Sequence, residues 1–105
     1  MARRLDGESF APFIRESTLP VLADFYQDGC VPCRRISPLI SKAESEYEGR
    51  IAFARVNLAQ NAGLAGELDI AAAPTIVLFK DGQETARHRG VIDRSGLKTL
   101  IESVL

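Results

Sequence analysis

Two cysteines separated by two residues are the side chains in this sequence best suited to chemistry. Cys30 and Cys33 stand in the stretch DFYQDGCVPCRR and are the only cysteines in the chain. Such a pair can belong to a metal site, a structural disulfide, or a dithiol that exchanges electrons with another molecule. Residues three apart in the first turn of a helix share a face, within the Cα separation of roughly 4.4 to 6.8 Å that a disulfide spans. The pair can therefore open and close without unfolding the chain.

The rest of the sequence argues against the first two kinds of site. A structural zinc ion generally needs four Cys or His ligands, and the chain adds one histidine, His88, in a distant predicted strand. Covalent haem attachment needs a histidine directly after the second cysteine, where the sequence has Arg34. A disulfide across so short a loop removes little entropy from the unfolded chain. The pattern favours a reversible redox pair and predicts no metal.

The position of Cys30 predicts a reactive thiolate. Apolar residues recur at helical spacing over 31–48, which places Cys30 at a helix N-terminus. Unpaired N–H groups and the helix dipole there lower the pKa of a thiol from its usual value of about 8.5. Pro32 suits the first turn, where a missing N–H costs nothing. Arg34 and Arg35 either add positive potential or form a solvated helix face.

The elements around this helix predict an α/β fold. An apolar strand over 20–27 precedes the cysteines and contains one buried acid, Asp24, whose pKa we expect burial to raise. A first helix is predicted over 9–17 with Ser9 as its cap. The remaining predicted elements are a strand at 50–58, a short helix at 61–69, strands at 75–80 and 84–89 joined by an Asp81–Gly82 turn, and a helix opened by Asp93.

Length and charge limit the possible functions. The chain has 105 residues with 46% apolar composition, which predicts a single domain over 1–105. Its 13 basic and 14 acidic residues leave a net charge of -1, so we expect no binding to nucleic acid or to an anionic membrane. The first residues lack the apolar run of a secretory signal, and no stretch is long enough to span a bilayer. These features predict a cytoplasmic protein.

Four segments, in order, resemble the thioredoxin family. They are DFYQDGCVPCRRISP, similar to the stretch around the family's W-C-G-P-C site, then ARVNLAQN, AAAPTIVLFKDG and RGVIDRSGLKTLIESVL. The match covers almost the whole chain from Ser9 onward. It implies a thioredoxin fold, with a central mixed β-sheet flanked by helices on both faces, and a protein-disulfide reductase.

The resemblance also implies roles for individual residues. Cys30 would be the nucleophile that attacks a substrate disulfide, and Cys33 would resolve the mixed disulfide. Asp24 matches the family's buried aspartate, which helps to move the proton of the second cysteine; a carboxyl satisfied by backbone donors is the alternative. Pro74 matches the cis-proline, beside which the backbone of Ala73 would pair with an extended substrate.

The sequence departs from the family pattern beside the cysteines. Gly29 replaces the usual tryptophan, Tyr26 stands where another tryptophan is common, and Val31 replaces a glycine. These changes affect contacts with substrates and reductase. Arg55 occupies the family's lysine position near Asp24, where a permanent charge would hold the carboxyl more ionised. The remaining residues expected at the substrate groove are Pro32 and Gly90.

The family further implies a partner and a source of electrons. A flavin-dependent thioredoxin reductase using NADPH would recharge the protein, which itself would need no bound cofactor, and disulfide-containing proteins would be its substrates. We expect a monomer. Two alternatives stay open: a disulfide oxidant or isomerase of the same fold, and an interaction module without turnover.

Overall fold

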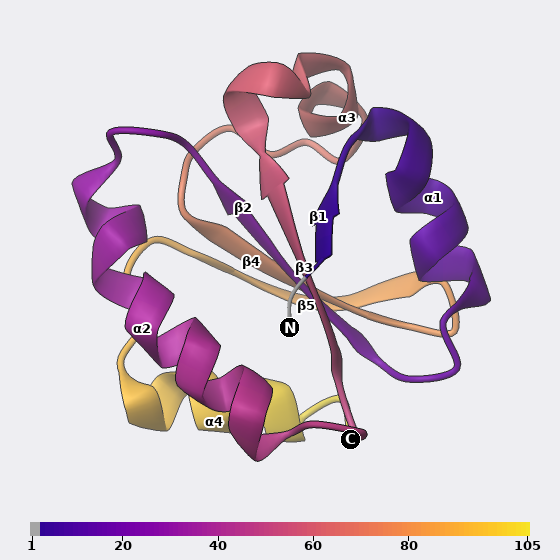
Figure 1. The fold of residues 1–105 in the computed structure, drawn as a ribbon, viewed down its shortest axis with the longest axis vertical. Coiled ribbons are helices and arrows are strands. Elements are labelled where there is room, and N and C mark those ends of the chain that lie inside the picture. The colour runs from indigo at the N-terminus through magenta and orange to yellow at the C-terminus, as the bar shows by residue number, and fades with distance from the viewer. Residues whose placement is uncertain (1–2) are drawn as a thin grey trace.

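A mixed sheet forms the centre of the computed structural model, which describes residues 3–105 (Figure 1). The strand order is β1-β3-β2-β4-β5. Strands β1 and β2 run parallel to β3, whereas β4 runs antiparallel to both β2 and β5. The strands are β1 (Arg3–Leu5), β2 (Val21–Tyr26), β3 (Ala52–Asn57), β4 (Thr75–Lys80) and β5 (Gln83–Arg89). The mixed sheet expected from the sequence is confirmed.

Helices cover both faces of this sheet, as predicted (Figure 1). Phe10 of α1 and Leu64 of α3 belong to one buried apolar cluster, and Ile36 of α2 and Ile101 of α4 belong to another. No helix within residues 3–105 combines the length and apolar character needed to cross a membrane. The helices are α1 (Gly7–Glu16), α2 (Val31–Glu46), the 3-10 turn η1 (Leu58–Gln60), α3 (Ala62–Glu67) and α4 (Arg94–Glu102).

The central strand β2 directs one polar side chain towards α2. Side chains alternate along a strand. Ala23 and Phe25 lie in the cluster with α1, and Leu22 lies in the cluster with α2 and α4. Asp24 therefore shares the face of Leu22, below the helix that begins at the cysteines. Asp24 is only 2% exposed to solvent.

The N-terminal segment differs from its prediction. Asp6, not Ser9, caps α1: its carboxylate accepts the N–H groups of Glu8 and Ser9. The Ser9 hydroxyl in turn accepts the Asp6 N–H at 3.0 Å, which completes a capping box. The prediction of Ser9 as the cap was wrong because the earlier acid supplies the same oxygen acceptor. Strand β1 was not predicted.

The C-terminal third follows its prediction closely. Asp81 and Gly82 adopt φ angles of 52° and 79°, as a two-residue turn between antiparallel strands requires. Asp93 caps α4, where its carboxylate accepts the Gly96 N–H at 2.7 Å. β4, the first strand of this hairpin, pairs with β2, the strand that leads to the cysteines.

Candidate active site

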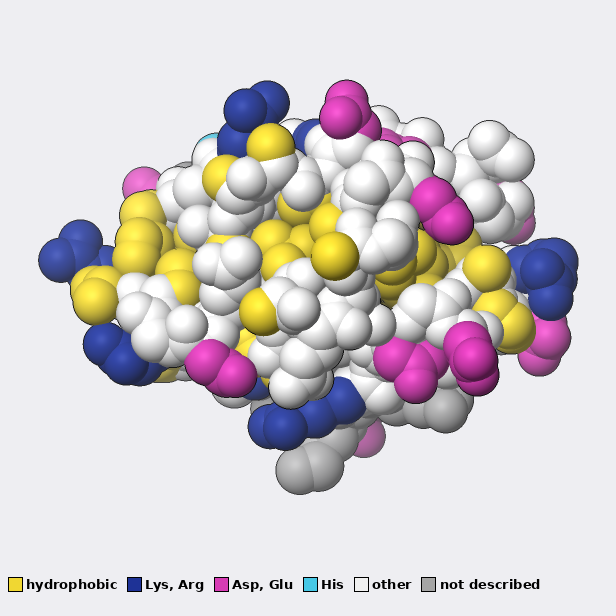
Figure 2. Space-filling model, turned by 90° about the horizontal axis from the view of Figure 1, so that it is seen from above, with side chains coloured by type: hydrophobic (Ala, Val, Ile, Leu, Met, Phe, Trp, Pro, Cys, Tyr) yellow, Lys and Arg dark blue, Asp and Glu magenta, His cyan; other side chains and the backbone are white. Residues whose placement is uncertain are grey.

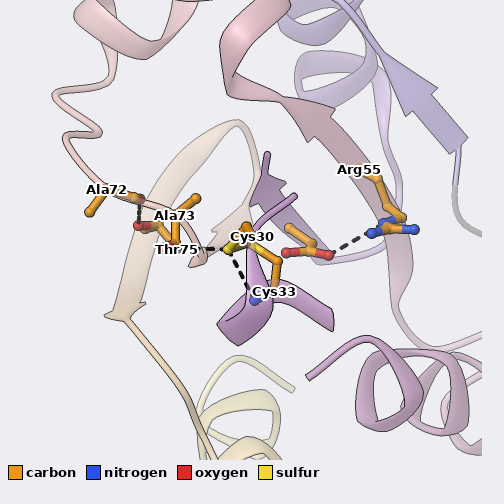
Figure 3. The surroundings of a disulfide bond; sticks show 7 residues. Cys30, Cys33, Arg55, Ala72, Ala73 and Thr75 are labelled. Carbon is orange, nitrogen blue, oxygen red and sulfur yellow. Dashed lines mark hydrogen bonds and ion pairs between the residues drawn. A yellow bond between two sulfur atoms is a disulfide. The ribbon is translucent and has the colours of Figure 1, made fainter. Parts of the chain in front are cut away.

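The cysteines stand at the start of α2 and form a disulfide (Figure 3). Their Cα atoms are 5.2 Å apart, within the range expected from their spacing. Cys30 is the N-cap, and the Cys33 N–H donates a hydrogen bond to the Cys30 sulfur at 3.1 Å. Cys30 is partly exposed, whereas Cys33 is 6% exposed. One sulfur can thus be reached from solvent, and the helix terminus offers an N–H that stabilises negative charge on it.

A partly buried ion pair lies on one side of the disulfide. Asp24 and Arg55 are register partners on the parallel strands β2 and β3. The Arg55 Nε donates to Asp24 Oδ2 at 3.3 Å, and the exposed fractions of the two side chains are 27% and 3%. Burial raises the pKa of the Asp24 carboxyl, while the charge and hydrogen bond of Arg55 act in the opposite direction. The second oxygen, Oδ1, is buried and has no hydrogen-bond partner among residues 3–105.

Tyr26 fixes the arginine from its other side. The guanidinium carbon of Arg55 lies 4.5 Å from the centroid of the Tyr26 ring, a cation–π arrangement. Arg55 is therefore held between a carboxylate and an aromatic face. The resemblance to thioredoxins placed Arg55 near Asp24, and the structure confirms that contact.

The other side of the disulfide is formed by the segment that enters β4 (Figure 3). The carbonyl oxygen of Ala73 lies 3.9 Å from the sulfur of the first cysteine, and the Ala73–Pro74 peptide bond is cis, as the resemblance implied. Thr75 Oγ1 donates to the Ala72 carbonyl at 2.6 Å. The Gly90 N–H donates to the Pro74 carbonyl at 2.8 Å, and its φ of 89° favours glycine. These bonds hold the Ala73 backbone beside the sulfur.

Apolar side chains are exposed directly after Cys30 and directly after Gly90 in the chain. Val31 and Val91 are 50% and 52% exposed, and Pro32 is also exposed. Figure 2 looks onto the end of the molecule that carries α3 and the loop before α2, and shows hydrophobic side chains across its middle with charged ones around the margin. Such a surface suits contact with another protein.

The structure brings the predicted site residues together and leaves His88 out. Its Nε2 lies 3.0 Å from the Val91 carbonyl oxygen, and no role in the site follows from this contact. Within residues 3–105, no three His, Cys, Asp or Glu side chains are grouped so that they could hold a metal ion.

Other residues near the site were not singled out as functional from the sequence. Asp28 accepts a hydrogen bond from the Asn57 side-chain amide at 3.3 Å, and Arg4 and Ser37 line a pocket beside Cys33. An acidic residue two positions before a cysteine was a usable signal for Asp28. Arg4 could not be placed because it belongs to the unpredicted strand β1.

A partly exposed and a buried cysteine at a helix N-terminus, on a mixed sheet, define a dithiol redox protein. The family model described as Thioredoxin matches residues 2–103. The thioredoxin of Rickettsia felis is 33% identical over 97 residues, which cover 92% of each chain. That of Synechocystis is 32% identical over 102 residues, covering 97% of this chain and 95% of the relative. The chloroplastic M-type thioredoxin of Spinacia oleracea is 34% identical over 101 residues, 96% of this chain but 56% of the relative.

The chain belongs to the thioredoxin family and is a thiol–disulfide oxidoreductase. The C-x-x-C pair at disulfide distance supplies the chemistry of that class.

Proposed function

We propose that the protein reduces disulfide bonds in other proteins, with Cys30 as the nucleophile and Cys33 as the resolving thiol. The Cys30 thiolate attacks one sulfur of the substrate disulfide, and the other substrate sulfur leaves as a thiolate. Cys33 then loses its proton and attacks Cys30, which releases the second substrate thiolate and closes the Cys30–Cys33 bond. Two electrons pass to the substrate. The difference in exposure between the two residues, Cys30 partly exposed and Cys33 buried, is the observation that carries this assignment.

Asp24 accepts the proton of Cys33 in the second step. Burial raises the pKa of Asp24, and a raised pKa is what a proton acceptor near neutral pH needs. Its Oδ1 is buried and has no hydrogen-bond partner among the described residues, so it is free to receive a proton. Arg55, positioned by Tyr26, modulates this step through its ion pair with Asp24.

The substrate lies across the exposed sulfur. An extended substrate segment pairs with the Ala73 backbone beside Pro74, where the carbonyl already lies 3.9 Å from the sulfur. The remaining groove residues are Gly29, Val31, Pro32 and Gly90. Exposure of Val31 and Pro32 next to the reactive sulfur supports their contact with substrate.

Electrons come from a thioredoxin reductase that uses NADPH and flavin, and the protein acts as a monomer in the cytoplasm without a bound cofactor of its own. Family membership supports the reductase as partner. The relatives from Rickettsia felis and Synechocystis both carry the name thioredoxin.

Trapping of the mixed disulfide tests the assignment of the two cysteines. The Cys33→Ser variant, incubated with a disulfide-bonded protein, should accumulate a covalent complex that a reductant dissolves and that mass spectrometry locates at Cys30. The matched Cys30→Ser variant should accumulate none. A complex in the second variant but not in the first would reverse the roles, and failure of the wild-type protein to reduce any disulfide would refute the proposed function.

A further inference from the structure

A charged pocket of about 350 Å³ opens beside the disulfide. Arg55, one of its lining residues, lies on the opposite side of the disulfide from Ala73 and Thr75 (Figure 3). Its lining includes the buried Cys33 and the neighbouring Gly29. A Cβ atom at Gly29 would meet nothing within 4 Å, so the space around this lining residue is open. The residues lining the pocket are Arg4, Tyr26, Gln27, Asp28, Gly29, Cys33, Arg34, Ser37 and Arg55.

Positive charge is concentrated in this pocket although the chain as a whole has a net charge of -1. Arg4, Arg34 and Arg55 line it, and Asp28 is the one acid among its lining residues. Asp28 is engaged by the Asn57 amide at 3.3 Å. When Asp24 behind Arg55 is ionised it neutralises one of the arginines, and the pocket still keeps an excess of positive charge.

The fold places two of these arginines side by side. Arg4 on β1 is the register partner of Arg55 on β3. Like charges directly opposite each other on adjacent strands destabilise a sheet. Arg55 has the buried Asp24 as partner, but neither Arg4 nor Arg34 forms an ion pair with any of residues 3–105, and both are exposed. These two guanidinium groups are available to an anion from outside.

We propose that this pocket, with Arg4 and Arg34 as its binding groups, is a subsite for the carboxylate of an Asp or Glu side chain next to the reactive cysteine of a protein substrate. The inference rests on the proposed function. A substrate held by its backbone at Ala73 crosses the exposed sulfur, so that a neighbouring side chain reaches the opposite side, where the pocket lies. Guanidinium groups bind carboxylates through paired N–H donors. The single negative charge of a carboxylate matches the pocket, because Asp28 already offsets part of the positive charge of its arginines.

Paired peptide disulfides test the subsite. Each pair differs only in Glu or Gln directly before or directly after the reactive cysteine, and kcat/KM is measured at about 50 mM salt. Reduction of the same peptides by dithiothreitol corrects for the intrinsic effect of the charge on the disulfide. For exposed ion pairs we expect the Glu peptide to be preferred by about 2- to 5-fold at one of the two positions. The preference should vanish at about 1 M salt, where screening acts within about 3 Å.

Variants assign the preference to the two arginines. The double variant Arg4→Ala, Arg34→Ala should show no preference even at low salt. Arg35→Ala is the matched control, because Arg35 is exposed on the same helix but does not line the pocket, and it should keep the wild-type preference. Arg55 is left intact because of its ion pair with Asp24.

The outcomes separate this inference from the proposed function. Equal reduction of Glu and Gln peptides by the wild-type protein overturns the subsite while leaving the reductase intact. A preference that survives in the double variant, or that disappears equally in Arg35→Ala, also overturns it. If the wild-type protein reduces none of the peptides, nor any protein disulfide, the proposed function fails and the subsite with it.

Discussion

Replacing Arg55 with methionine should destabilise the oxidised protein by an amount that depends on pH. Arg55 Nε lies 3.3 Å from Asp24 Oδ2, and the Asp24 side chain is 3% exposed. Methionine keeps an unbranched apolar side chain but removes the charge, the hydrogen-bond donor and the guanidinium that lies over the Tyr26 ring. The oxidised form is the right one to test, because its cysteines do not titrate.

The size of the loss follows from the geometry. Two unit charges 3.3 Å apart attract each other by roughly 5 kcal/mol at an effective dielectric constant of about 20. Desolvation of the carboxylate and solvent around the partly exposed guanidinium offset much of this attraction. Hydrogen bonds to charged groups typically stabilise proteins by about 1.5 to 3 kcal/mol. We expect a loss in this range when Asp24 is ionised.

The pH dependence has a definite sign. Burial raises the pKa of Asp24, and Arg55 opposes that rise, so its removal raises the pKa further. Below the ordinary Asp value of 3.8 the carboxyl is protonated in folded and unfolded protein alike, and the ion pair contributes nothing. The loss caused by Arg55→Met should therefore be small in acid and should grow as pH rises through the folded pKa of Asp24.

Urea unfolding of the oxidised proteins from pH 4 to 8.5 measures this difference. Arg50→Met is the matched control, because the Arg50 guanidinium lies 5.3 Å from the Tyr47 ring centroid and that site contains no buried Asp. The control should show a small loss with little pH dependence between these limits. A loss for Arg55→Met that is the same at every pH would refute the reasoning, because it would mean that packing alone accounts for the effect.

Three further changes test other parts of the site. Asp24→Asn should gain stability relative to wild type as pH rises from 4 to 8, because ionising a carboxyl with a raised pKa costs the folded state; urea unfolding measures this, and parallel stability curves for the two proteins would contradict it. The same variant should release substrate from the mixed disulfide more slowly, which quenched-flow trapping measures. Gly29→Ala should lower the free energy of unfolding by about 1 kcal/mol, because Gly29 has a φ of 74°, which disfavours a side chain even in open space. Thermal unfolding measures this, and an unchanged melting temperature would argue against that backbone conformation. Ile36→Ala should lower the free energy of unfolding by about 2 to 5 kcal/mol in urea, because Ile36 lies on the buried face of α2 and is 1% exposed; a loss below 1 kcal/mol would contradict this packing.

The parts of the fold that local patterns determine could be predicted from the sequence. The helix after Cys30 begins with a proline in its first turn, and the Asp81–Gly82 turn and the Asp93 cap each have a local signal. The cysteine pair and the buried Asp24 were also predicted from local sequence. The spacing of the two cysteines is visible directly, and an acid within an apolar strand stands out by itself. The resemblance to thioredoxins supplied the contact between Arg55 and Asp24.

Features that depend on distant pairing could not be predicted. Strand β1 has three residues, two of them arginines, so it shows neither the length nor the apolar alternation of a strand. Its partner β3 lies about fifty residues later, and only that pairing brings Arg4 beside Arg55. The charged pocket is thus a product of sheet order, and the sequence around the cysteines shows only one of its arginines, Arg34.

The equilibrium reduction potential of the Cys30–Cys33 couple tests the central claim most directly. The protein is equilibrated in defined glutathione buffers, its thiols are alkylated, and the oxidised fraction is counted by mass. A disulfide reductase should give a value near about -270 mV. A value of about -120 to -180 mV would contradict the account, because a cysteine couple with so high a potential belongs to an oxidant or isomerase.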